Sequence, residues 1–458
     1  MKKLVHLTIL TLLSRIILGG LLSNIPLIHI WVYAINIASI VLLIKNIGKA
    51  IVFAEFLSFS AITLWLTVPL FMWDLGADKL LVPNLFGAEI LAIPENIYLN
   101  WAIPATLALI SGLFLFEIKQ KRLTQSLSLL TKYLDSLPKE RALHIFIVGS
   151  IGLFAGKFVP SSAGFIFFLL SQLIFISVLY CLFGQFKYTK IIYLGAGLLS
   201  LIGVAASGMF GELVWWGLVI VIYGLLKVEW SFSKKLIIIS SGILVLSTLQ
   251  NIKNEYRRLT WMAKGGQEAS LTLLGTTAWK TIFKSGSVPL KNSTGFVLYR
   301  MNQAYTVSRV MKFVPKKEPY ANGETIFASL AASFVPRFLW PDKPMSGGHE
   351  NMKRFARFDP HGGASYDIGQ IGDAWANFGY WGGIIFLFVY GFFNSWLLKS
   401  IISVSSVKLP SLILWIPVVF LQLLKVEVSV LTNFNAAIKG VIFVALVFWM
   451  FKKMGVKL

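Results

Sequence analysis

The sequence WGGIIFLFVYGFFNSWLL occupies residues Trp381–Leu398 and contains no charged side chain. Its eighteen residues are about the length that an α-helix needs to cross the hydrocarbon core of a bilayer. The whole chain has a similar character, because 56% of its 458 residues are hydrophobic, only 14% are charged, and its mean hydropathy is +0.74. This composition predicts an all-α polytopic membrane protein.

Apolar stretches of comparable length recur along the chain and predict about twelve transmembrane helices. Arg15 interrupts the first stretch and no small-residue cleavage site follows it, so we expect an uncleaved span rather than a signal peptide. The predicted spans are Leu4–Leu22, Leu27–Ile44, Ile51–Trp73, Tyr98–Phe116, Ala142–Phe158, Ala163–Phe183, Ile191–Ser207, Leu213–Leu226, Leu236–Gln250, Trp381–Leu398, Leu409–Leu424 and Val430–Phe451. They predict an N-terminal bundle of about nine spans over residues 1–250, a polar loop over 251–380, and about three C-terminal spans over 381–458.

The positions of the basic residues orient these spans, because cytoplasmic loops carry an excess of Lys and Arg. If the N-terminus is cytoplasmic and the spans alternate in direction, the short outer loops contain only Lys79, Lys157 and Lys425. The other basic residues of the short loops and the tails then lie in the cytoplasm. We therefore predict that both termini are cytoplasmic and that loop 251–380 is external. The outer loop Asp74–Asn96 faces the same side, and we expect it to be the partner of the large loop.

The interval from Asn251 to Tyr380 is too polar to span a bilayer and too long to be a simple connector, so we expect it to carry the function. It contains seventeen basic and nine acidic residues. A basic surface beside a membrane attracts anions, of which lipid head groups and lipid-linked phosphates are the usual candidates, although solubility alone also accounts for single lysines. Nucleic acid is not an expected partner, because the sequence shows no recognisable binding module.

Three helices are predicted inside this interval, over Gln267–Phe283, Ser293–Phe313 and Gly323–Phe334. Arg300 and Arg309 lie nine positions apart, which places them on opposite faces of a straight helix. Glu324 falls in the first turn of the third helix, where a carboxylate suits the helix dipole, so both a structural and a functional role are open.

A stiff segment follows the third helix and reads VPRFLWPDKP over residues 335–344. Its three prolines fix the backbone, which favours a binding element because less entropy is lost when a ligand docks. The side chains that this segment offers are Arg337, Trp340, Asp342 and Lys343. The alternative is a proline-stiffened surface loop with an incidental Arg–Asp pair.

Two motifs carry a resemblance to a known family: FVPRFLWPDKP at residues 334–344 and GDAWANFGYWGG at residues 372–383, which leads into a span. Together they resemble bacterial O-antigen and exopolysaccharide polymerases of the Wzy type, over about Arg300 to Gly383. The related O-antigen ligases share the layout of many spans and one large external loop. The fold implied is a helical bundle with short external helices, as in membrane glycosyltransferases that use lipid-phosphate donors.

The resemblance implies polymerisation of oligosaccharide repeat units carried on undecaprenyl diphosphate, at the periplasmic face of the bacterial plasma membrane. The donor is already activated by its lipid diphosphate, so no nucleotide or other cofactor is implied. A chain-length regulator protein is a further implied partner, besides the lipid-linked oligosaccharide and membrane lipid. A ligase would differ only in its acceptor, which would be a lipid A core or a protein hydroxyl.

Such a reaction needs groups that hold a diphosphate, position a hydroxyl and take its proton. Arginine suits the first task because its planar fork binds two phosphate oxygens. We therefore assign Arg337 first, then Arg300 and Arg309, with Lys343 as an added charge. The candidate bases are His349 and His361, with Glu324 and Asp373 behind them. Trp340 and Trp375 are candidates to stack on sugar rings, and Asp342 and Asp373 are further candidates for substrate binding.

No Asp-X-Asp, Glu-X-Asp or His-X-X-X-His pattern occurs, so no metal site is predicted. A different class of function is indicated by Arg15, Glu55, Glu212 and Lys439, which lie in or near predicted spans. Charges there are costly when they face lipid and can line a transport path, which would make the protein a flippase or exporter of lipid-linked oligosaccharide. Buried ion pairs that hold the bundle together are the alternative explanation.

Overall fold

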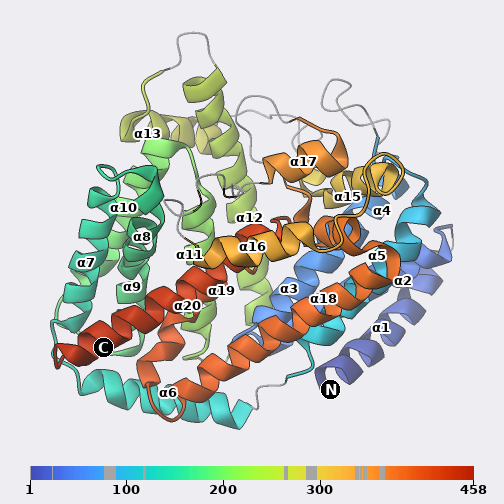
Figure 1. The fold of residues 1–458 in the computed structure, drawn as a ribbon. Helices are drawn as coiled ribbons and strands as arrows, with labels where there is room; N and C mark the ends of the chain where they lie inside the picture. Colours follow the sequence, from blue (N-terminus) through green and yellow to red (C-terminus); the bar gives the residue numbers. More distant parts are fainter. Residues whose placement is uncertain are drawn as a thin grey trace. The chain divides into compact units, whose positions relative to one another are not determined.

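The computed structural model describes residues 2–22, 24–76, 89–116, 120–228, 230–262, 267–284, 297–335, 340, 343, 348–359 and 367–458. Over these residues the chain is helical and contains no β-strand, which confirms the all-α prediction (Figure 1). The chain divides into two compact units. The first comprises Met1–Leu43, Val52–Thr124 and Thr294–Met450, and the second comprises Ile44–Ile51, Gln125–Ser293 and Phe451–Leu458.

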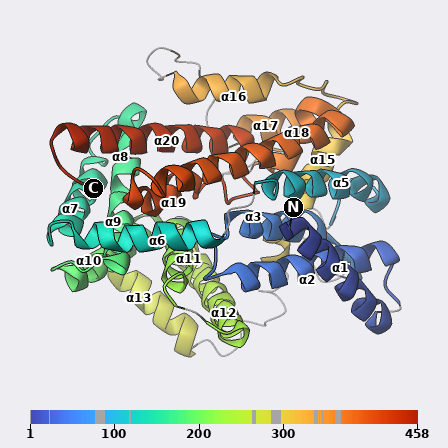
Figure 2. The same cartoon turned by 90° about the horizontal axis from the view of Figure 1, so that it is seen from below.

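The first unit combines N-terminal and C-terminal helices with the short helices of the polar interval. Its elements are α1 (Lys2–Leu21), α2 (Leu27–Asn46), α3 (Phe53–Ala61), a π-helical segment (Ile62–Thr67), α4 (Val68–Asp74), α5 (Glu95–Leu113), α15 (Gln303–Phe313), α16 (Glu324–Phe334), α17 (His349–Ala356), α18 (Gly369–Ser405), a 3-10 segment (Pro410–Trp415), α19 (Ile416–Phe420) and α20 (Val430–Lys453). Figure 2 shows α16 on the opposite side of α18 from α1 and α2.

The second unit consists of the middle helices and the beginning of the polar interval. Its elements are α6 (Gln120–Asp135), which begins in the first unit, α7 (Arg141–Ala155), α8 (Ser161–Ser171), α9 (Leu173–Phe183), α10 (Thr189–Ser207), α11 (Gly211–Leu225), α12 (Phe232–Arg257), α13 (Leu271–Trp279) and two π-helical segments (Arg258–Met262 and Lys280–Lys284). Buried Tyr256 donates a hydrogen bond to the Ala205 carbonyl at 2.6 Å and packs with Leu274, which joins α10, α12 and α13.

Eight helices of the described chain are long and apolar enough to cross a membrane, which fits a membrane protein. They are Lys2–Leu21, Leu27–Asn46, Phe53–Asp74, Gly164–Phe183, Thr189–Ser207, Phe232–Trp261, Gly369–Ser405 and Val430–Lys453, and each overlaps one predicted span. The other four predicted spans coincide with α5 and with the shorter apolar helices Arg141–Ala155, Gly211–Leu225 and Pro410–Phe420. The count of twelve spans therefore stays a prediction.

Close contact between α5 and α18 positions the polar interval. A Cβ atom added to Gly391 would lie 2.4 Å from the Leu109 carbonyl oxygen, so only glycine permits this approach. Nearer the start of α18, the Tyr380 carbonyl accepts a hydrogen bond from Trp101 Nε1 at 3.0 Å. Gly379 adopts φ 64° and ψ −152°, which interrupts the helix between its polar first part and its apolar second part. Helix α18 begins at Gly369. The sequence instead predicts loop as far as Tyr380 and a span from Trp381.

Candidate functional site

The short helices α15 and α17 form a small apolar core with the start of α18. Buried Val310, Phe355 and Ile368 pack together in this core. The predicted continuous helix Ser293–Phe313 is wrong in one respect, because the chain breaks at Asn302, whose side chain caps α15 by accepting the Tyr305 amide at 3.2 Å. Arg300 and Arg309 are therefore not on one straight helix, and residues 291–296 lie outside the described residues.

The segment before α5 packs against α15. Asn302 Nδ2 donates to the Ile90 carbonyl at 2.9 Å, and the Ala92 amide donates to Ser308 Oγ at 2.9 Å. These two hydrogen bonds confirm that the segment predicted as the partner of the large loop contacts it. They anchor α15 to the segment before α5.

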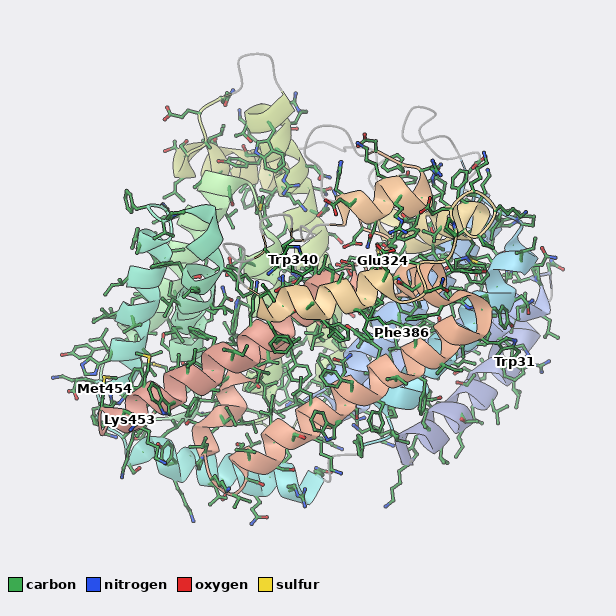
Figure 3. The ribbon with its side chains drawn as sticks, viewed as in Figure 1. Trp31, Glu324, Trp340, Phe386, Lys453 and Met454 are labelled. Atoms are coloured by element: carbon green, nitrogen blue, oxygen red, sulfur yellow. The ribbon has the colours of Figure 1, made fainter. Side chains whose placement is uncertain are left out.

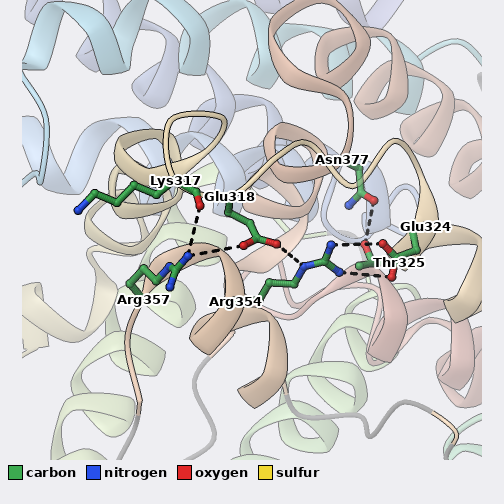
Figure 4. A network of polar contacts seen from close by, with 7 residues as sticks. All are labelled: Lys317, Glu318, Glu324, Thr325, Arg354, Arg357 and Asn377. Carbon is green, nitrogen blue, oxygen red and sulfur yellow. Dashed lines mark hydrogen bonds and ion pairs between the residues drawn. The ribbon is translucent and has the colours of Figure 1, made fainter.

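Arg354, from α17, is the centre of a network of polar contacts (Figure 4). Its Nε donates to Glu318 Oε1 at 2.8 Å, and its two terminal nitrogens donate to the two oxygens of Glu324 at 3.3 and 3.2 Å. Arg357 lies 3.6 Å from the second oxygen of Glu318 and donates to the Lys317 carbonyl at 3.3 Å. Hydrogen bonding to Glu318 is the main cause that raises the pKa of Arg354 above its ordinary value.

This network, which comprises Glu318, Glu324, Arg354 and Arg357, lies at the surface. Glu324 is 66% exposed and Arg354 is 35% exposed, so solvent screens their attraction. Because Glu324 meets the guanidinium through two nearly equal contacts, its carboxylate occupies the position that two oxygens of a phosphate would take. The arrangement can therefore exchange a weakly held carboxylate for a phosphate.

A histidine lies on the same short helix as Arg354. His349 is the first residue of α17, and its Nε2 lies 3.2 Å from Asp359 Oδ1, while Lys353 Nζ lies 2.8 Å from Asp359 Oδ2. The His349 side chain is 50% exposed. A carboxylate beside Nε2 orients the imidazole and leaves the other ring nitrogen to meet a hydroxyl group of a substrate.

Arg309, a predicted substrate-binding residue, contacts the end of α17 in the structure. Its Nε donates to the Ala356 carbonyl at 3.0 Å and its Nη2 to the Arg357 carbonyl at 3.1 Å, while the guanidinium lies over the ring of Phe358. These contacts satisfy the carbonyls at the end of α17, where a cation also complements the helix dipole. The geometry therefore favours a structural role for Arg309 in joining α15 to α17.

Asp373 is also held by the protein itself. Its side chain is buried, and its two oxygens accept hydrogen bonds from Asn351 Nδ2 at 3.3 Å and from the Val430 amide at 2.8 Å. Asp367 Oδ2 accepts from the neighbouring Ser429 amide at 2.8 Å. Two carboxylates thus cap the N-terminus of α20, where negative charge is favoured. Burial raises the pKa of Asp367 to about 6.

The remaining predicted site residues are scattered. Lys343 is buried, and its Nζ donates to the carbonyl of Val335, the residue after α16, at 2.9 Å. Arg300 is exposed and Trp340 is partly buried. Arg337, Asp342 and His361 lie outside the described residues, so their predicted roles stay predictions.

A second titratable cluster was missed by the sequence reasoning. Buried His29, on α2, has Asp74 Oδ1 at 2.9 Å from its Nδ1 and Glu95 Oε1 at 2.7 Å from its Nε2. The Tyr33 hydroxyl donates to the same Asp74. The cluster joins the beginning of α2 to the end of α4 and the beginning of α5. A histidine within a predicted span was the signal that could have revealed it.

The charges near the predicted spans also have protein partners where the contacts are defined. Lys3 Nζ lies 2.5 Å from Glu55, Gln172 donates to Glu212 at 2.6 Å, and the Arg15 guanidinium lies 5.6 Å from the centre of the Trp31 ring. Ion pairing and hydrogen bonding within the bundle therefore account for Glu55 and Glu212. Across the described residues, no group of three His, Cys, Asp or Glu side chains could hold a metal ion.

Comparison with known proteins gives a family but no activity. No curated protein and no solved structure matches the chain. The family described as "Domain of unknown function (DUF8712)" matches residues 47–456. Because this match extends over most of the sequence, the chain belongs to the DUF8712 family.

Proposed function

We propose that this protein polymerises oligosaccharide repeat units carried on undecaprenyl diphosphate, at the periplasmic face of the bacterial plasma membrane. The observation that carries the proposal is the surface network of Arg354, which offers a forked guanidinium beside Arg357 and, on the same helix, the His349–Asp359 pair. A lipid diphosphate needs cations of this kind at the end of an apolar tail.

The donor diphosphate binds Arg354 by replacing Glu324, which is the more exposed of its two carboxylate partners. Glu318 stays in place and orients the guanidinium, since it is 20% exposed and contacts both Arg354 and Arg357. The exchange costs little, because an exposed ion pair contributes only about 0–1 kcal/mol. A doubly charged diphosphate gains more from the two guanidinium groups than a single carboxylate does.

The chemical step forms one glycosidic bond and breaks one. The acceptor hydroxyl oxygen attacks the anomeric carbon of the donor chain, the bond from that carbon to the diphosphate breaks, and undecaprenyl diphosphate leaves with the bonding electrons. The hydroxyl proton passes to His349, which Asp359 orients through Nε2. Arg354 and Arg357 stabilise the negative charge that develops on the leaving diphosphate.

Helix α16 offers a path for the polyprenyl tail. Its N-terminal residue Glu324 belongs to the Arg354 network, whereas Phe327 and Phe334 along the same helix are 67% and 64% exposed. Figure 3 places Glu324 at one end of α16 and Trp340 beyond the other end. A helix that is charged at its beginning and apolar along its outer face suits the boundary between head groups and hydrocarbon. The tail can then remain in lipid while the diphosphate meets the arginines.

A second candidate, a flippase or exporter of the same glycolipid, is favoured by the buried polar side chains on α18 and α20. Asp373, Asn394 and Asn433 lie in candidate spans and are almost completely buried. Polar groups at such positions often mark transport paths. The transfer assay below separates the two candidates.

The test uses purified protein in liposomes with undecaprenyl-diphosphate oligosaccharides extracted from the cells that produce it, without added nucleotide. We expect a ladder of longer lipid-linked chains and release of undecaprenyl diphosphate. Glycan transfer to a lipid A core or a protein hydroxyl would identify a ligase instead. Movement of the glycolipid across the bilayer without a new glycosidic bond would identify an exporter.

A matched pair of variants connects the assay to the network. Arg354→Ala should slow chain extension on the order of 100-fold, because a positioned donor to developing charge is lost. Lys312→Ala removes the same charge from an exposed position of α15 and should leave the rate near that of the unaltered protein. Equal rates for both variants would remove Arg354 from the mechanism.

A further inference from the structure

Buried His29 lies between two carboxylates where α2, α4 and α5 meet. Its Nδ1 is 2.9 Å from one oxygen of Asp74, the last residue of α4, and 3.0 Å from the other. Its Nε2 is 2.7 Å from Glu95 Oε1, at the first residue of α5. Both carboxylates are only partly exposed. Each ring nitrogen therefore has a carboxylate of its own.

These contacts require two hydrogen-bond donors on one ring. An ionised carboxylate only accepts hydrogen bonds, and a neutral imidazole has a single N–H. Both contacts form together only when the three side chains hold one further proton, which makes the ring an imidazolium. Among the described residues, no Lys or Arg forms an ion pair with Asp74 or Glu95. Without that proton, the two negative charges have no cationic partner, which is unfavourable where solvent access is limited.

Loss of the proton affects the two carboxylates unequally. Among the described residues, the titratable groups in contact with His29 are Tyr33 of its own helix, Asp74 of α4 and Glu95 of α5. Asp74 meets Nδ1 with both oxygens and also accepts from the Tyr33 hydroxyl. In the same part of the chain, the Glu95 side chain has no hydrogen bond other than the one from Nε2. A neutral ring therefore keeps its proton on Nδ1 and turns a lone pair toward Glu95, and this contact is lost.

Glu95 is connected to α15 through the segment that precedes it, residues 90–94. Asn302 Nδ2 donates to a backbone carbonyl of this segment, and Ser308 Oγ accepts from one of its amides, each at 2.9 Å. Arg309, on the same helix as Ser308, then bonds to the end of α17. The Glu95 contact is thus one end of a continuous series of contacts that reaches the short helices of the polar interval.

We propose that His29, Asp74 and Glu95 form a proton-binding site, and that the bound proton holds residues 90–94, and with them α15, in place. With the proton bound, the imidazolium donates to both carboxylates and joins α2 to α4 and to α5. When the proton leaves to solvent as the pH rises, Glu95 separates from the ring and residues 90–94 are held less tightly. The site does not depend on the glycosyl transfer proposed above, because none of its three residues takes part in that reaction.

The test measures amide hydrogen exchange of the full-length protein in detergent by mass spectrometry, with each rate corrected for the intrinsic pH dependence of exchange. The series covers about pH 5 to 9, which brackets the titration of histidines in proteins. We expect the amides of residues 90–93 and of α15 to exchange on the order of 10-fold faster at the upper end, because a hydrogen bond between charged groups is lost.

Two substitutions with opposite effects separate the proton from the contact that it makes. Glu95→Gln provides an amide that can donate to Nε2 of a neutral ring, so residues 90–93 should stay protected at every pH. His29→Gln removes the ring, so the same residues should exchange rapidly at every pH. His6→Gln is the control, because His6 is an exposed histidine of α1. It should retain the full pH response.

Three results would contradict the proposal. Corrected exchange rates that do not change with pH would mean that no proton holds this segment. A response that persists in both Glu95→Gln and His29→Gln would belong to a different titratable group, and its loss in His6→Gln would assign it to α1. Hydrogen exchange needs no substrate, so each result is independent of whether the protein extends glycan chains.

Discussion

Two polar regions of the first unit use carboxylates in opposite ways. In the surface network, Glu324 is 66% exposed and pairs with an arginine that solvent also reaches, so the pair is weak and replaceable. At the N-terminus of α20, Asp373 is 1% exposed and is held by a backbone amide and an asparagine. Breaking such a buried arrangement leaves hydrogen-bond donors without partners. The exposed region is therefore suited to exchange a ligand, whereas the buried one is suited to hold helices together.

The largest expected effect tests the buried region. Asp373→Ala should lower the free energy of unfolding by about 4 kcal/mol, because the Val430 amide and the Asn351 side chain lose their acceptor. Glu324→Ala should change it by less than about 1 kcal/mol. Thermal unfolding in detergent measures both. Similar losses of unfolding free energy in the two variants would contradict the difference between the buried and the exposed carboxylate.

The next effect concerns proton transfer in the surface region. His349→Gln should reduce chain extension roughly 1000-fold with the unfolding midpoint unchanged, because a general base contributes about that factor and the side chain is half-exposed. Asp359→Asn should reduce the rate less, since the imidazole remains. Rates are measured from the product ladder in liposomes. An unchanged rate in His349→Gln would assign the base to another residue.

A series of unfolding measurements at different pH values tests Asp367, the buried carboxylate beside Asp373. Burial raises the pKa of Asp367 from 3.8 to about 6, so the folded state holds this proton more tightly than the unfolded chain does. Protonated Asp367 therefore stabilises the folded state fully below about pH 4. This contribution to the free energy of unfolding, up to about 3 kcal/mol, is lost as the pH rises through about 6. Asp367→Asn should make the unfolding midpoint depend less steeply on pH over that window. A slope that survives the substitution would point to another carboxyl group.

The smallest effect separates charge from shape in the surface network. Arg354→Lys keeps the positive charge but cannot form two parallel bonds to a phosphate, so chain extension should fall about 10-fold. The unfolding midpoint should stay nearly constant, as expected for an exposed pair. A lysine variant with full activity would show that a point charge suffices at this position.

Local sequence signals predicted a helix well where the residues that begin and end it lie within the same segment. The helix after Gly323 ends at Phe334 as expected, because the proline that follows cannot continue it. The break at Asn302 was missed, since its cap depends on contacts with the distant Ile90 carbonyl as well as on its own turn. Glu324 was placed at a helix start with both roles open, and the structure shows that its carboxylate also meets Arg354.

The candidate site was only partly predictable for the same reason. His349, Glu324 and the arginines of the interval could be identified as residue types that suit the chemistry, but their partners could not. Arg309 was expected at the ligand, and its bonds to the last carbonyls of α17 could not be foreseen from its local sequence. Arg354 and Arg357 were passed over, because nothing in their local sequence shows that Glu318 lies beside both of them.

The sequence by itself determined that the described chain is helical and rich in candidate spans, because long apolar runs must satisfy their backbone hydrogen bonds within a helix. It also determined that α16 ends at Phe334, because the proline that follows cannot continue a helix. Only the tertiary structure decided which charges meet, since Arg354 and Glu318 are 36 residues apart and pair through folding. It likewise decided which carboxylates are buried. Whether a charged side chain is buried, and which partner it meets, depends on segments that are distant in the sequence. Burial and pairing together distinguish a replaceable charge from a structural one.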